Sequence, residues 1–544
     1  MAGPNVRFSR WRLLATLPVA AVAAGALVAG SAQAGAGGAG HPAGPRGLAP
    51  GDLLVSGSTY TNDPGIVAGQ TVLPPGCTTG CVTATADGTY PQVFNNVLAD
   101  PSFGVTSKIT LTELSPSGRT LGALAVPSSS PAGRVVTSFS SKSELALNLS
   151  TDRRYVTFMG YDAAPDTVDV SNSNTPGVVD PTDPVPGAYY RTVAQLGADG
   201  RFQFTNTNAY SGNNGRAAIL NSRAGVYYAA GNAGNGSAPQ PAGIILGAGA
   251  QLIKPSRRPQ AWQRPGTPTP AGSFSVTQLG DPADKVGKDD NFRGLAVYDN
   301  VVYYTKGSGG NGVNTVYFLD TTGKACPSGV GLPVPGAPRP ASPLAYNPAT
   351  VGADGLPSNM CVLKGFPTAL KSTTSFPFGL WFAGPDTLYV ADEGNGTNTY
   401  SAATGTYTAA AGQTTAGLQK WVLTGGSWHL AYTLAAGLAL GTPYTVAGYP
   451  TGDNAATKLP WAPATDGLRN LTGRVNRDGT VTVYAVTSTV SGGGDQGADP
   501  NKLVAITDRV PATAPAAGEA FRTVRAAGFG QVLRGVSFTP GTRS

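Results

Sequence analysis

Arginine stands at the same position in four similar segments of this sequence. The segments read RAAIL, RGLAV, RNLTG and RGVSF, and they begin at Arg216, Arg293, Arg469 and Arg534. A guanidinium group binds carboxylate, sulfate or phosphate through parallel hydrogen bonds. If the four segments converge, their arginines predict a binding site for an anion. The alternative is that each arginine pairs with a neighbouring segment or caps backbone carbonyl groups.

Polar side chains also follow the second apolar run of several segments, and they are the candidates for catalysis. They are Tyr161, Asp162, Lys306, Asp392 and Glu393. Asp392 and Glu393 are adjacent, so on an extended strand their side chains point to opposite faces, whereas the two carboxyl groups of a glycosidase face one gap. We expect Asp392 to accept hydrogen bonds from backbone amides of the next turn. Asp162 with Asp392 or Glu393, across a channel, is the better candidate for a carboxylate pair.

Other common chemistries have little support in the sequence. The loops DEGNGTN and SGGGDQGADPN are rich in oxygen ligands but lack the spacing of an EF-hand, so no metal site is predicted. No glycine fingerprint in the strand-then-helix setting of a dinucleotide site supports a nicotinamide or flavin cofactor, no G-x-S-x-G motif occurs, and no cofactor is expected. His429 is expected on a strand far from any channel, and Trp381, Trp421 and Trp428 are expected in a sheet core.

The segments that carry these residues form a repeat. Examples are GRAAILNSRAGVYYAAGNAGNG, FRGLAVYDNVVYYTKGSGGNG and FGLWFAGPDTLYVADEGNG, and in the last of these Phe378 replaces the arginine. A degenerate copy, in which Ser143 takes the arginine position, reads ELALNLSTDRRYVTFMGYDA. Each copy has a strand, a turn, a second strand and a Gly-rich loop, and two more strand candidates follow most copies. Repeated units of four antiparallel strands predict an all-β protein of the β-propeller type.

The two ends of the chain predict how the ring closes. LRGVSFTPG, near the C-terminus, is a first strand without partners, whereas DLLVSGSTY, SKITLTEL and TLGALAVPS, near the N-terminus, lack a first strand. One blade completed by both ends would leave no free sheet edge. This count gives six blades. Seven is the alternative if residues 51–142 contain a further sheet.

PFGLWFAGPDTLYVADEGNG resembles an NHL-type propeller repeat, with its Pro-Gly-apolar strand followed by LYVAD and Gly/Asn. More broadly, LSTDRRYVTFMGYDA and GLRNLTGRVNRDGTVTVYAVTST resemble a group of secreted bacterial and fungal propeller proteins. The resemblance covers most of the chain after about residue 140. It implies a propeller fold and carries over no catalytic residues.

The N-terminal residues predict export. Residues 1–34 have the basic start, apolar run and small-residue cleavage site of a signal peptide, with a membrane anchor as the alternative. Residues 35–50 are expected to be a disordered leader, and residues 51–544 a single propeller domain. The four cysteines predict two disulfides, which by proximity are Cys77 with Cys81 and Cys326 with Cys361.

These observations favour a secreted, extracellular binding protein. Its expected partner is an anionic small molecule or an acidic glycan, bound at the arginine-rich mouth. The alternative is a polysaccharide lyase or glycosidase acting on uronate-containing glycans at the same site, and the sequence leaves open whether the protein is an enzyme. The formal net charge of +7 includes the signal peptide, and no Lys/Arg run alternates with aromatic residues. No nucleic-acid partner and no membrane contact after signal cleavage are therefore predicted, and a monomer is expected.

Overall fold

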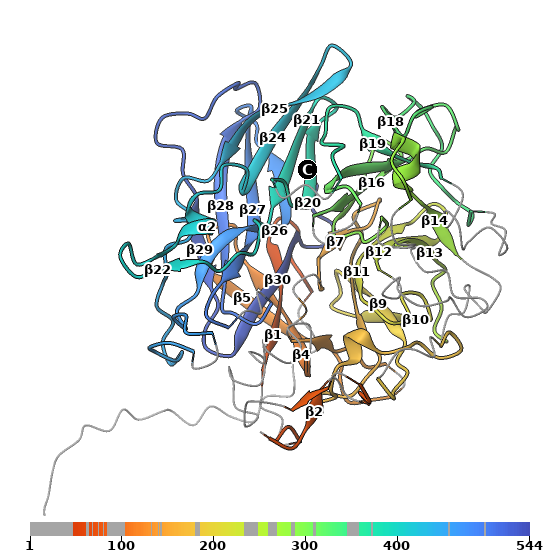
Figure 1. Ribbon diagram of the computed structural model, residues 1–544. Coiled ribbons are helices and arrows are strands. Elements are labelled where there is room, and N and C mark those ends of the chain that lie inside the picture. The colour runs from red at the N-terminus through yellow and green to blue at the C-terminus, as the bar shows by residue number, and fades with distance from the viewer. Residues whose placement is uncertain are drawn as a thin grey trace, which may run out of the picture. The chain divides into compact units, whose positions relative to one another are not determined.

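Six four-stranded antiparallel sheets form a ring, so the protein is a six-bladed β-propeller (Figure 1). The computed structural model describes residues 47–60, 65–67, 69–73, 76–79, 81–83, 104–131, 133–139, 141, 144–179, 185–232, 249–258, 269–283, 289–307, 312–344, 358–370, 374–454, 457–493 and 497–543. Residues 45–544 make up one compact unit. The expected signal peptide and most of the expected leader lie outside the described residues.

The inner strand of each blade is the first strand of a repeat, and each blade is named below after it. The inner strands are β7 (Asn148–Leu149), β11 (Gly215–Asn221), β15 (Leu295–Tyr298), β20 (Pro377–Gly384), β26 (Ala464–Val475) and β30 (Gln531–Phe538). Successive inner strands contact one another around the whole ring, from β7 through β30 and back to β7. The ring therefore brings the repeated positions of all six segments around one axis.

Three further strands extend each blade outward. The second strands are β8 (Tyr155–Tyr161), β12 (Val226–Gly231), β16 (Val301–Lys306), β21 (Thr387–Asp392), β27 (Thr480–Val490) and β1 (Leu53–Thr59). The third are β9 (Arg191–Gly197), β13 (Ala250–Ile253), β17 (Thr315–Leu319), β24 (Gly417–Thr424), β28 (Lys502–Arg509) and β4 (Thr106–Leu114). The fourth are β10 (Phe202–Thr207), β14 (Pro270–Gly272), β19 (Met360–Leu363), β25 (Ser427–Leu434), β29 (Arg522–Ala526) and β5 (Thr120–Ala125).

The shorter elements lie beside or between these sheets. They are the hairpins β2 (Val72–Leu73)–β3 (Val82–Thr83) and β22 (Tyr400–Ser401)–β23 (Thr406–Tyr407), the edge strands β6 (Thr137–Ser138) and β18 (Val330–Gly331), the 3₁₀ turns η2 (Val170–Asn172) and η3 (Val276–Leu279), and helix α2 (Thr408–Ala411). Among the described residues of 51–142, these and the β30 blade account for every strand. The alternative of seven blades is therefore wrong.

Both chain ends close the ring, as the sequence predicted. The C-terminal strand β30 pairs antiparallel with the N-terminal strand β1, from Leu53 opposite Phe538 to Thr59 opposite Gln531. β1 continues the sheet to β4, and β4 to β5. Leu48, within the expected leader, is buried, and its amide donates to the carbonyl of Ala198.

Glycine lets neighbouring inner strands approach closely. A methyl group at Gly294 would lie 1.8 Å from the carbonyl oxygen of Phe378 in the next blade, and one at Gly379 would lie 2.6 Å from the carbonyl oxygen of Arg469. Thr305 donates its hydroxyl to the same Phe378 carbonyl at 2.5 Å. These contacts hold the backbones of successive blades at a fixed separation.

We expect Gly294→Ala to lower the free energy of unfolding by about 3 kcal/mol, since the added methyl group has no space and the strands must move apart. Gly384→Ala is the matched control, because its methyl group would meet only Asp386 Oδ1, at 3.7 Å. Urea denaturation of both variants measures the difference. Equal stabilities would contradict the importance of this close approach.

The two predicted disulfides, Cys77–Cys81 and Cys326–Cys361, are confirmed. The second joins Cys326, in the excursion between β17 and β19, to Cys361 on β19. Among the described residues, no helix has the length and apolar character needed to cross a membrane.

Candidate functional site around the channel axis

Three of the four repeated arginines form a chain of electrostatic neighbours, in which Arg293 lies within range of Arg469 and acts on Arg216. Burial lowers the pKa of Arg216 well below its ordinary value, and the charge of Arg293 lowers it further. Burial also lowers the pKa of Arg293, where the carboxylate of Glu393 acts in the opposite direction and the charge of Arg469 adds to the lowering. Arg293 and Arg469 belong to blades that the β20 blade separates. They influence each other because both lie near the ring axis.

Among the described residues, the hydrogen-bond acceptors of Arg216 are all neutral. It is 2% exposed. Nη1 donates to Asn291 Oδ1 at 2.5 Å and to the carbonyl of Phe292 at 2.7 Å, and Nη2 donates to Asn214 Oδ1 at 3.4 Å. Its Nε has no hydrogen-bond partner there. A buried cation without a carboxylate in hydrogen-bond contact is unfavourable unless an anion joins it.

Arg469 makes a direct ion pair within the cluster. Its Nε lies 3.2 Å from Glu393 Oε2, and both side chains are almost fully buried. Glu393 follows β21, so the pair bridges the β20 and β26 blades. The carbonyl of Glu393 also accepts the hydroxyl of Ser488 at 2.6 Å. Glu393 therefore serves as a counter-ion for Arg469 and Arg293.

Arg534 is buried where the β30 blade meets the β7 blade. Its guanidinium donates to the backbone carbonyls of Phe139 and Ser141, and Nε donates to Ser58 Oγ at 3.4 Å. These contacts match the alternative expectation that a repeated arginine caps carbonyl groups. Ser143, which was aligned with this position in the degenerate copy, lies outside the described residues.

Glu144 extends the polar network into the β7 blade. It is buried, and it accepts hydrogen bonds from the hydroxyl of Tyr161, from Thr137 Oγ1 at 2.7 Å and from Asn214 Nδ2 at 3.1 Å. Its charge also acts on Arg216. Burial, and then the charge of Glu144, raise the pKa of Tyr161 well above its ordinary value. Tyr161 therefore stays protonated near neutral pH and is unsuited to act as a general base.

The remaining catalytic candidates do not meet at one point. Asp162 forms an ion pair with Arg134 at 2.9 Å and accepts from Asn206 Nδ2 at 2.7 Å. Asp392 accepts from the amide of Gly394 in the next turn, as expected, at 3.0 Å, and also from the amide of Phe376, before β20, at 2.8 Å. Lys306 is buried, and its Nζ donates to Asn314 Oδ1 at 3.4 Å.

Sequence reasoning missed the partners of the arginines. Glu144, Asn214 and Asn291 complete the network around Arg216, and none was singled out beforehand. A signal for two of them exists, since Asn214 and Asn291 each stand two residues before a repeated arginine. His429 lies on β25, the outermost strand of its blade, and Trp421 and Trp428 are buried in the core, as expected.

Asp499 is a buried carboxylate whose ionisation can be tested by changing the pH. It accepts the hydroxyl of Tyr449 at 2.7 Å, and Oδ2 has no hydrogen-bond partner among the described residues. Burial raises its pKa to about 6, although hydrogen bonds and the charge of Arg469 act against this. The folded protein thus binds this proton more tightly than the unfolded chain. Its contribution to stability is complete below about pH 4 and is lost as the pH rises through about 6.

Asn at this position is neutral at every pH. We therefore compare the unfolding free energy of Asp499→Asn with that of the original protein at each pH. This difference should shift in favour of the variant by about 2 kcal/mol as the pH rises from 4.5 to 8. Chemical denaturation at several pH values measures this. A difference that does not change with pH would show that Asp499 ionises at its ordinary pKa.

The arrangement is thus a buried axial cluster of guanidinium, carboxylate and amide groups from at least five blades. It has the chemistry for holding an anion. Comparison of the chain with protein-family models and with curated protein sequences finds no match.

Proposed function

We propose that this protein is an extracellular β-propeller that binds an anionic ligand, of the acidic-glycan class, at the axial arginine cluster. The observation that carries the proposal is Arg216. Its buried guanidinium lies beside Arg293 and has only neutral hydrogen-bond acceptors among the described residues. A carboxylate or sulfate group would accept from the guanidinium edge and add a counter-charge in direct contact, whereas Glu144 acts on Arg216 without a hydrogen bond.

An acidic glycan fits the other features of the chain. The N-terminal residues have the pattern of an export signal, and two disulfides are typical of proteins that mature in oxidising compartments. The resemblance of the repeat to the NHL type supports a binding role and does not indicate a reaction. Extracellular polymers with uronate or sulfate groups present the required anions.

The test is calorimetric titration with an oligogalacturonate and with its neutral methyl ester. We expect the acid to bind and the ester to bind at least about tenfold more weakly, because removing one charge-assisted contact costs about 1.5 to 3 kcal/mol. Affinity should also fall with added salt. Equal binding of acid and ester would contradict the proposal. An unsaturated uronate product, detected by its ultraviolet absorbance, would instead assign lyase chemistry to the site.

A further inference from the structure

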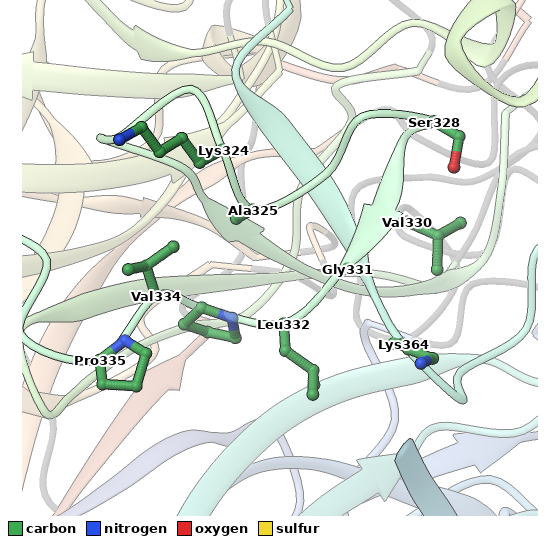
Figure 2. Close-up of a pocket in the computed structure, with 10 residues that line it drawn as sticks. Lys324, Ala325, Ser328, Val330, Gly331, Leu332, Val334, Pro335 and Lys364 are labelled. Carbon is green, nitrogen blue, oxygen red and sulfur yellow. The ribbon is translucent and has the colours of Figure 1, made fainter. Parts of the chain in front are cut away.

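A second possible ligand site lies away from the axis, on the excursion between β17 and β19. The pocket has a volume of about 580 Å³ and is drawn in Figure 2. Its apolar lining comes from Val330, Leu332 and Val334 with two prolines, and Lys324 and Lys364 are its charged residues. Figure 2 shows the two lysines at opposite ends of the lining, with Gly331 and Leu332 between them. The volume falls in the range of small-molecule sites.

One disulfide and several backbone contacts hold the wall of this pocket in place. The Cys326–Cys361 disulfide ties the excursion to β19. β18 pairs in parallel with β19, and the amide of Lys364 donates to the carbonyl of Gly331 at 2.8 Å. A methyl group at Gly331 would lie 1.8 Å from the carbonyl oxygen of Ala325, so only glycine lets this strand pass so close. The pocket is therefore preformed.

The charges of the pocket select the sign of its ligand. Its lining has two lysines and no acidic residue. Neither lysine ammonium group forms an ion pair or hydrogen bond with another described residue. Both are thus available to a ligand, and an anion is the complementary partner.

The apolar part selects the rest of the ligand. Pro333 and Pro335 have no amide hydrogen, so the segment after β18 is a poor template for pairing with a peptide strand. Valine, leucine and proline side chains favour a hydrocarbon chain instead. We infer that this pocket binds an aliphatic carboxylate, with its chain along Leu332 and its carboxylate at a lysine. The site is independent of the axial arginine cluster.

Calorimetric titration of the full-length protein with decanoate, decanol and decyltrimethylammonium tests this inference. Decanoate is expected to bind about tenfold more tightly than decanol, and the cationic compound is expected not to bind. Shortening the acid from decanoate to octanoate should weaken binding by up to about fourfold for each methylene group removed from the apolar wall. Equal binding of all three decyl compounds, or no binding of decanoate, would overturn the inference.

Variants then assign the binding to this pocket. Lys324→Ala and Lys364→Ala should each weaken decanoate binding by about two- to fivefold, as expected for exposed ion pairs, and the double variant by about tenfold. Lys108→Ala, which removes an exposed lysine of β4, is the matched control and should bind like the original protein. Arg216→Gln should also leave decanoate binding unchanged, which separates this site from the axial one. Unchanged affinity in the double lysine variant, with an unchanged melting temperature, would overturn the inference.

Discussion

Replacing Asp508 with alanine is expected to lower the free energy of unfolding by about 3 to 5 kcal/mol. Asp508 on β28 is fully buried between the β20 and β26 blades, where its Oδ2 lies 3.1 Å from Lys420 Nζ. The hydroxyls of Tyr389 and Tyr432 donate to the same carboxylate. Without Asp508, the Lys420 ammonium would lose its direct ion pair and keep only the partly exposed carboxylate of Glu519 as a nearby counter-charge.

Two variants make this prediction specific. Asp386→Ala removes an exposed carboxylate from the turn between β20 and β21 and should change the stability by less than about 0.5 kcal/mol. Lys420→Met combined with Asp508→Asn removes both charges, so we expect it to lose less stability than Asp508→Ala alone. Urea denaturation of the set gives the comparison. A loss below about 1 kcal/mol in Asp508→Ala would show that the ion pair does not hold these blades together.

Removing residues 529–544 is expected to abolish cooperative folding. The deletion takes away β30, and all seven residues of β1 then lose their partners on that side. Asn501 also loses its two hydrogen bonds to Leu533, at 2.8 and 2.9 Å. The ring opens and exposes a long sheet edge, a cost comparable to the total stability of a typical domain, about 5 to 15 kcal/mol.

The control for this deletion is removal of Arg543 and Ser544 alone, which leaves β30 intact and should preserve the melting transition. Thermal unfolding followed by circular dichroism distinguishes the two truncations. A cooperative transition at the original temperature after removal of β30 would contradict closure of the ring by the two chain ends.

The fold was predictable because each blade repeats the same local chemistry. Alternating Tyr and Val positions, Gly-rich turns and a recurring first strand all indicate the same four-stranded unit, and each can be recognised without knowing its neighbours. The unpaired first strand around Arg534 even predicted the closure. By contrast, Leu48 belongs to no repeat, and its hydrogen bond to Ala198 could not be predicted from the sequence.

The site was less predictable, because its geometry depends on contacts between blades. Alignment of the repeats placed Arg216, Arg293 and Arg469 at one level, but it gave no information on which acceptors surround each guanidinium. Glu144 reaches Asn214 only because the β7 and β11 blades are adjacent in the ring. Asp162 and Asp392 stand at the ends of equivalent second strands, yet each is held by partners close to its own blade.

The most direct test of the proposed function is the affinity of an oligogalacturonate for Arg216→Gln and Arg216→Lys. Arg474→Gln, near the C-terminal end of β26, is the matched control. Circular dichroism checks that each variant is folded. We expect binding to fall by about tenfold or more in Arg216→Gln, to recover partly in Arg216→Lys, which keeps the charge, and to be unchanged in Arg474→Gln. Original affinity in a folded Arg216→Gln variant would contradict anion binding at the axial arginine cluster.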